Sequence, residues 1–175
     1  TADPATDTLS IPDALPILSM AFTPNQASGG DVVSVDFTFT NSSGTTGLTD
    51  LAFNFPYQAF FSGATPTSFP TAGSCGSGSN FSQVSSGGLQ QFTVTGGNLA
   101  ASGSCSCSFT LTLATNTPSG DVTANTSLVS GQAGGATVSG SAASATLSIG
   151  GDNEINFSKS FQTNPIVAGN STVLE

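Results

Sequence analysis

The sequence of 175 residues contains no histidine and no tryptophan, and it has a single lysine or arginine. Histidine is the commonest general base and metal ligand, so its absence excludes Ser-His-Asp and Cys-His catalysis and the usual zinc sites. A paired-carboxylate mechanism would remain, but the ten acidic residues are scattered and mostly lie beside predicted turns. We therefore predict that the protein is not an enzyme and needs no cofactor.

Charge of either sign is scarce, at 6% of residues, and the net charge is −9. One cation cannot make the several phosphate contacts that bind nucleic acid or an anionic membrane surface. Hydrophobic residues make up 37%, including 13 phenylalanines, so the chain can build a core. No apolar run approaches the roughly 20 residues of a spanning helix. The chain begins at Thr1 without an apolar leader, and we expect that a leader was removed or that the chain is part of a longer one.

Apolar residues recur at every second position over much of the chain, a pattern typical of half-buried strands. The clearest runs are 33–39 and 105–113, and shorter ones cover 51–55, 92–94, 122–128 and 143–149. Gly, Pro, Asn and Ser clusters separate these runs and predict turns. The pattern predicts an all-β protein, an immunoglobulin-like two-sheet antiparallel sandwich with extra terminal strands. We expect the segment 56–78, which is rich in Phe and Pro, to be irregular and to cover an open end of the sandwich.

The three cysteines are Cys75, Cys105 and Cys107. Cys105 and Cys107 are two residues apart, so on a strand they point to the same face, and a bond between them would strain the backbone. A disulfide between Cys75 and one of the other two is therefore favoured, with three reduced and buried cysteines as the alternative. Such a bond would close a loop of about 30 residues and contribute about 3 kcal/mol on the chain-entropy model.

The two ends of the chain repeat parts of its middle. Residues 8–11 (TLSI) recur as residues 146–149, and residues 18–22 match residues 157–161 in the pattern Ser-x-x-Phe. From residue 18 onward the second copy keeps a constant offset, the 139 positions between Phe22 and Phe161. The repeat predicts that residues 1–16 are the end of a preceding repeat or a donor strand, and that residues 17–149 form one whole sandwich. Residues 150–156 would be a linker, and residues 157–175 the start of a next repeat or a donor strand.

A partial repeat cannot bury its apolar face alone. Either the units follow one another in a tandem array, or neighbouring subunits lend strands to each other. In the second case we expect Leu9, Ile11, Phe157 and Phe161 to carry the contacts between subunits. The expected partner is then the protein itself or an adjacent repeat.

The opening LSMAFTP at residues 18–24, the Gly29-Gly30 turn and the segment 96–105 (GGNLAASGSC) resemble a known family. It is the tandem immunoglobulin-like repeat family of unknown function found in bacterial surface and secreted proteins, of the paired-cysteine type. The resemblance implies a disulfide between Cys75 and Cys105, an extracellular or cell-surface location, and no known catalytic residues. This chain departs from the family at Met20, where a lysine is usual and where the second copy has Lys159, and in its additional Cys107.

Several residues are weaker candidates for a site. Asp152, Asn153 and Glu154 at the expected junction offer oxygen ligands for Ca²⁺, but three fall short of the roughly six to eight that Ca²⁺ needs, which favours a solvated linker. Lys159 is expected to be solvated and not to form an isopeptide cross-link.

Aromatic residues offer a further candidate. A Phe-rich set is more typical of a core than of a ligand platform, and Tyr57 is the one aromatic with a polar group that could line a sugar site. The set comprises Phe53, Phe55, Phe60, Phe61 and Phe69.

These observations favour a structural building block of an extracellular bacterial filament or surface repeat array. Its units would be joined head to tail by β-strand complementation or tandem linkage. The alternative is an adhesin domain that binds a glycan or a partner protein, which predicts a concave exposed aromatic patch.

Overall fold

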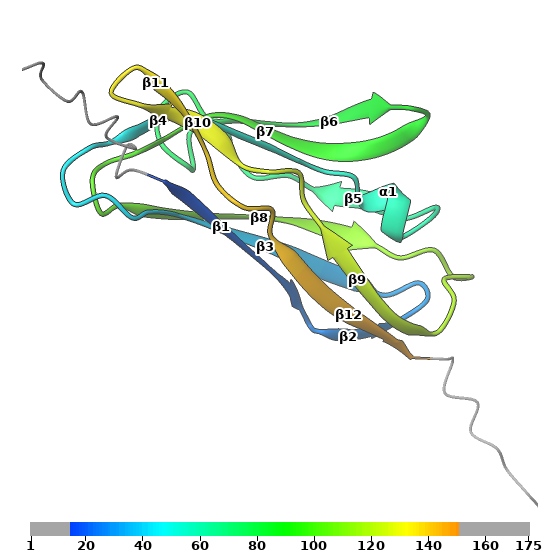
Figure 1. The fold of residues 1–175 in the computed structure, drawn as a ribbon. Helices are drawn as coiled ribbons and strands as arrows, with labels where there is room; N and C mark the ends of the chain where they lie inside the picture. The colour runs from blue at the N-terminus through cyan, green and yellow to red at the C-terminus, as the bar shows by residue number, and fades with distance from the viewer. Residues whose placement is uncertain (1–14, 151–175) are drawn as a thin grey trace, which may run out of the picture.

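The computed structural model describes residues 15–150, which form a β-sandwich with one short helix (Figure 1). A four-stranded sheet has the order β1-β3-β8-β5, and a five-stranded sheet has the order β11-β10-β4-β7-β6. A small third sheet has the order β2-β12-β9. The four-stranded sheet consists of β1 (Pro16–Thr23), β3 (Val32–Asn41), β8 (Ser104–Thr112) and β5 (Thr65–Ser68). The five-stranded sheet consists of β11 (Ala136–Ser139), β10 (Ser130–Ala133), β4 (Leu48–Phe55), β7 (Leu89–Leu99) and β6 (Asn80–Ser86). The remaining elements are β2 (Gln26–Ser28), β12 (Ser144–Gly150), β9 (Gly120–Asn125) and the helix α1 (Tyr57–Phe60).

The predicted all-β antiparallel sandwich is confirmed, and its register follows the alternation in the sequence. In β3, alternate residues from Val33 to Phe39 are at most 1% exposed, whereas the residues between them face outward. A shift by one residue would turn this apolar row into solvent, so the row fixes the pairing of β3 with β8. In that pairing Phe37 stands opposite Cys107 and Val35 opposite Phe109. One pair of strands is parallel, β12 with β2.

Aromatic side chains join the two large sheets. Phe92 from β7 and Phe109 from β8 stack with ring centroids 4.5 Å apart. Phe37 from β3 stacks on both of them, with centroid distances of 5.7 Å and 6.3 Å. All three side chains are fully buried, so this stack forms the centre of the core.

The expectation for segment 56–78 was wrong in part. It contains α1 and the strand β5, which pairs with β8 at the edge of the four-stranded sheet. β5 shows no apolar alternation, because most of its residues are exposed and it includes Pro66. An edge strand needs neither an apolar face nor a hydrogen bond from every backbone amide. No helix among residues 15–150 is long and apolar enough to cross a membrane.

The chain enters and leaves the sandwich at opposite ends (Figure 1). β1 begins beside the segment 139–141, whereas β12 ends at Gly150, which pairs with Ser28 at the turn between β2 and β3. β1 and β12 run alongside each other between these two ends. The residues before β1 and those after β12 are therefore attached to opposite ends of the sandwich.

Candidate functional site

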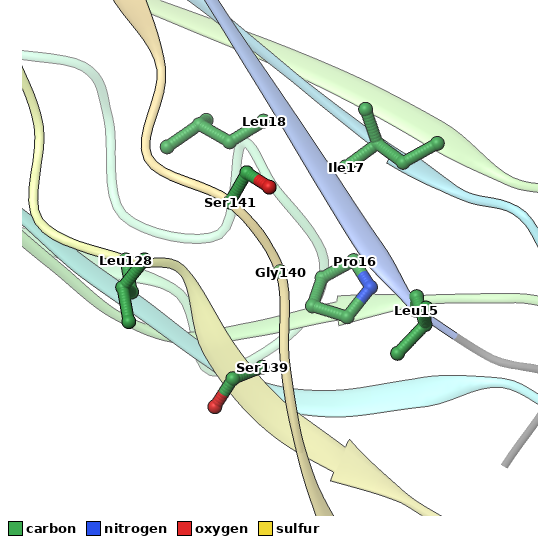
Figure 2. A pocket seen from close by; sticks show the side chains of 8 residues that line it. All are labelled: Leu15, Pro16, Ile17, Leu18, Leu128, Ser139, Gly140 and Ser141. Carbon is green, nitrogen blue, oxygen red and sulfur yellow. The ribbon is translucent and has the colours of Figure 1, made fainter. Parts of the chain in front are cut away.

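An apolar groove lies at the end of the sandwich where β1 begins (Figure 2). Its volume is about 410 Å³. Pro16 and Leu18 point from β1 towards the segment 139–141, and Leu128 stands on the connection between β9 and β10. The full lining comprises Leu15, Pro16, Ile17, Leu18, Leu128, Ser139, Gly140 and Ser141.

Three apolar side chains near the start of β1 are open to solvent: Leu15 is 43% exposed, Ile17 52% and Leu128 63%. Ile17 points away from the segment 139–141 (Figure 2). These side chains are three of the seven large hydrophobic ones that are exposed among residues 15–150. Single exposed apolar residues are ordinary, but a cluster at one end of a domain is typical of an interaction surface.

Backbone contacts fix Leu128 in its outward position. The Ser127 amide donates to the Asn54 carbonyl of β4 (2.8 Å), and the Asn54 amide donates back to Ser127 Oγ (2.9 Å). Next to it, the Gly140 amide donates to the Val129 carbonyl (2.8 Å). The connection is therefore hydrogen-bonded to β4 before Leu128 and to the segment after β11 beyond it, and the Leu128 side chain faces solvent.

Contacts with the connection between β3 and β4 fix Leu15 in the same way. Its amide donates to Ser42 Oγ (3.4 Å), and that hydroxyl donates to the Leu15 carbonyl (3.1 Å). On the other side of β1, a side chain at Gly140 would collide with the Pro16 carbonyl oxygen and stand 2.9 Å from Val129 Cγ1. Glycine thus allows the segment 139–141 to approach the start of β1.

A second depression, of about 540 Å³, lies further along β1 and separates its second half from the start of β12. Residues 20–25 line one side and residues 144–146 the other. β1 is the last strand of its sheet, so its outer edge has no ladder partner within residues 15–150. The Ser148 amide donates to the Asn25 carbonyl (3.0 Å) only where β12 reaches β2. An unpaired strand edge of this kind is a template for another strand.

Charged side chains contribute little to either surface. Residues 15–150 contain four aspartates and no lysine or arginine. Asp36 accepts hydrogen bonds from Thr23 Oγ1 (2.7 Å) and Ser34 Oγ (2.6 Å), and Asp121 accepts one from Ser148 Oγ (2.6 Å). The described residues contain no group of three His, Cys, Asp or Glu side chains that could hold a metal ion.

Two of the cysteines lie on β8, which flanks β3 on the side opposite β1, and Cys105 stands across Phe39 from the groove residue Leu18. Cys75 and Cys105 form a disulfide with Cα atoms 5.4 Å apart, which is the pairing that the family resemblance implies. The Cys75 carbonyl accepts from the Asn98 amide of β7 (3.0 Å), so the bond ties β8 to the other large sheet. Cys107 is free and buried, and burial raises the pKa of its thiol to about 12.

The structure excludes one possibility that the sequence left open, and it corrects one prediction. Tyr57 is fully buried and burial raises its pKa, so it does not line an open sugar site. The alternation over 122–128 predicts that Leu128 faces inward, but β9 ends at Asn125 and Leu128 points to solvent.

Most of the Phe-rich set belongs to the core, as predicted. Phe53, Phe55 and Phe61 are at most 2% exposed, Phe60 packs against the core, and Phe69 is 40% exposed.

Other predicted residues lie outside the described part of the chain. They are Leu9, Ile11, Asp152, Asn153, Glu154, Phe157, Lys159 and Phe161. The groove itself was missed, because its residues come from the expected junction and from a connection that the alternation had merged with a strand. The apolar pair Leu15 and Ile17 beside Pro16 was the signal that could have indicated it.

The fold and the groove define a β-sandwich module with an apolar surface at one end. Residues 16–149 match the domain of unknown function DUF7933, and the chain belongs to this family. No curated protein is similar enough to the sequence to count as a relative.

Several solved structures share the fold. A cohesin module from a family 33 glycoside hydrolase of Clostridium perfringens is 12% identical, with a TM-score of 0.53, over 81% of this chain and 100% of that one. A chain of a type I cohesin–dockerin complex from Clostridium thermocellum is 9% identical, with a TM-score of 0.54, over 79% of this chain and 97% of that one. The major pilin subunit of Bacillus cereus is 8% identical, with a TM-score of 0.50, over 91% of this chain and 52% of the pilin. At these identities the similarity shows the fold alone, and the chain spans about half of the pilin subunit.

Proposed function

We propose that this protein is a structural building block of an extracellular bacterial filament or surface repeat array, with units joined head to tail. One observation carries the proposal: the chain enters and leaves the sandwich at opposite ends, and an exposed apolar groove marks the end where it enters. A head-to-tail contact between such ends does not close on itself and builds a fibre or a rod. A cohesin of a cohesin–dockerin complex and a pilin subunit use the same fold, which is compatible with a module for assembly between proteins.

The repeated segments support the same function. Residues 146–149 form part of β12, where Leu147 and Ile149 are buried. Residues 8–11 have the identical sequence, TLSI. Leu9 and Ile11 are therefore suited to occupy the corresponding positions of a sandwich.

The C-terminal copy is suited in the same way to the place of β1. Leu18 and Phe22 are buried in β1, and Phe157 and Phe161 stand at the matching positions of the second copy. We propose the boundaries 1–16, 17–149, 150–156 and 157–175 for the end of a preceding unit or donor strand, the sandwich, the linker, and the start of a next unit or donor strand.

An oxidising location outside the cell fits the disulfide between Cys75 and Cys105, because such bonds persist in secreted proteins. The outward faces of β3 and β8 consist mainly of Ser and Thr. No histidine is present to serve as a general base. We propose that the protein performs no catalysis, uses no cofactor and acts through contacts with other copies or repeats.

Sedimentation velocity of the full chain over a concentration series tests this function. We expect species larger than the monomer, and we expect deletion of residues 1–11 to abolish them if the units exchange strands. The double variant Leu9→Ser with Ile11→Ser should act like the deletion, whereas Ser10→Ala, which changes only the polar residue between them, should not. A deletion variant that still assembles would eliminate strand donation by residues 1–11. A full chain that is monomeric at every concentration would contradict self-assembly and leave only tandem linkage.

The alternative, an adhesin that binds a glycan or a partner protein, has less support from the described residues. A glycan site is usually built on exposed aromatic side chains, and Phe69 is the one large aromatic among the exposed hydrophobic residues of 15–150. We therefore favour the assembly function over the adhesin.

A further inference from the structure

We propose that the apolar groove at the start of β1 is the docking surface for the opposite end of a second copy of this domain, around Val32. The proposal rests on the proposed function, in which units follow one another head to tail. It adds to that function a specific contact between the folded parts of two units, separate from any exchange of strands. The contact would turn a string of tethered domains into a stiff rod.

The length of the junction brings the two ends together. If residues 8–11 form the last strand of a preceding unit, as their identity with residues 146–149 of β12 suggests, then four residues separate that strand from β1. Five Cα-to-Cα steps lead from Ile11 to Pro16, and a fully extended chain covers at most about 17 Å in that distance. The end of the preceding unit must therefore lie within about 17 Å of the groove, and Leu15, which lines the groove, belongs to the junction itself.

The end of the unit where β12 finishes carries an exposed apolar residue on a rigid turn. Gly150 pairs with Ser28, and the turn that follows is closed by hydrogen bonds in both directions between Ser28 and Asp31. The Asp31 carbonyl also accepts from the Leu113 amide (2.9 Å), which fixes the turn to the end of β8. Val32 follows directly and is 53% exposed.

The groove and the Val32 side chain match in apolar character, and the neighbouring Asp31 carboxylate is held by the Ser28 amide (2.8 Å). The groove is lined by apolar residues with three small or hydroxyl residues, 139–141, and it contains no charged side chain. The turn offers Val32 as a compact apolar side chain of a size that a groove of about 410 Å³ can accept. A tether of a few residues provides an effective concentration of about 1 mM or more, so a contact of modest area is sufficient to align the units.

Site-specific cross-linking tests the contact on the full 175-residue chain. Two single variants, Leu128→Cys in the groove and Val32→Cys on the turn, are mixed and treated with a short bifunctional maleimide. Both positions are solvent-exposed, so neither substitution removes a core contact, and the native Cys107 is buried. The variants are mixed at about 1 mM each, which matches the effective concentration that the short junction provides between consecutive units. We expect the mixture to yield a cross-linked heterodimer at least about ten times faster than either variant alone.

A matched control places the cysteine at an exposed apolar position that does not line the groove. Leu89→Cys, at the hairpin between β6 and β7, has an exposure of 44%, similar to the groove residues, and should cross-link to Val32→Cys only at the background rate. Equal rates for Leu89→Cys and Leu128→Cys would overturn the proposal. Rapid cross-linking of Leu128→Cys to itself would also overturn it, because the groove would then meet another groove.

Sedimentation of the same mixtures separates this proposal from the function on which it rests. Assembly in sedimentation without the Leu128–Val32 cross-link would reject the groove as the docking surface and leave the building-block function standing. A mixture that neither assembles nor cross-links would contradict the docking contact and self-assembly by strand exchange, and would leave only units joined covalently in tandem.

Discussion

Among single residues, Cys107 has the most altered chemistry, because its thiol is buried opposite Phe37 with a pKa of about 12. In the unfolded chain the thiol loses its proton near pH 9, whereas in the folded chain it keeps the proton up to about pH 12. The unfolded state then binds fewer protons, so stability that is fully present below pH 9 is lost as the pH rises from 9 towards 12.

We predict that the free energy of unfolding of the wild type falls more steeply than that of Cys107→Ala over this range. The difference should grow by up to about 1.4 kcal/mol per pH unit. Urea unfolding of both proteins at several pH values measures it, and Tyr57 titrates in both and cancels. Parallel pH curves would show that the thiol is not buried as described.

Gly140 is the residue on which the shape of the groove depends most directly. A Cβ at this position would collide with the Pro16 carbonyl oxygen, so the segment 139–141 or the start of β1 would have to move. We predict that Gly140→Ala lowers stability by about 1–3 kcal/mol, as other overpacking substitutions do. Gly44→Ala, where the nearest atom is 3.9 Å from the added Cβ, is the control and should change the melting temperature little. Equal melting temperatures for both variants would contradict the close approach.

At the scale of elements, the disulfide holds β8 to the segment before β6 and thereby to the second sheet. The sequence separation of 30 predicts that the double variant Cys75→Ala with Cys105→Ala is less stable by about 3 kcal/mol. Urea unfolding measures the loss, with Cys107→Ala as the control for removing a buried sulfur without a cross-link. A double variant no less stable than this control would show that the bond contributes nothing to the fold.

Strands that bury one face could be predicted from the sequence, and strands at the edges could not. β3 and β8 place an apolar residue at every second position, and their inward rows are buried as the alternation indicates. β6 and β11 expose most of their residues, and their partners, not their own side chains, determine that they are strands. No local apolar pattern marks such an edge strand.

The candidate site was visible in the sequence only in part, for a related reason. The amino-acid sequence alone predicts the junction before β1, and it contains the repeat that predicts head-to-tail order. The position of Leu128 cannot be predicted in this way, because it depends on the hydrogen bonds of Ser127 to Asn54 on a strand that is distant in sequence. Spacing alone leaves the partner of Cys75 open between Cys105 and Cys107, and the family resemblance implies Cys105.

At the scale of the whole molecule, the balance of charge opposes association. The net charge is −9, and neighbouring units of like charge repel each other. Salt screens this repulsion and leaves an apolar contact intact, so we predict that assembly strengthens when the salt concentration rises from roughly 10 mM to 200 mM. Sedimentation velocity at both concentrations measures the change. Dissociation in the higher salt would show instead that ion pairs hold the units together.

The central claim is that these units join end to end. Negative-stain electron microscopy of the full chain at high concentration tests it most directly. The longest strand, β7, has 11 residues and a length of about 36 Å, so with a junction the account predicts filaments with an axial repeat of about 40–50 Å. Dispersed compact particles of one domain at every concentration would contradict it.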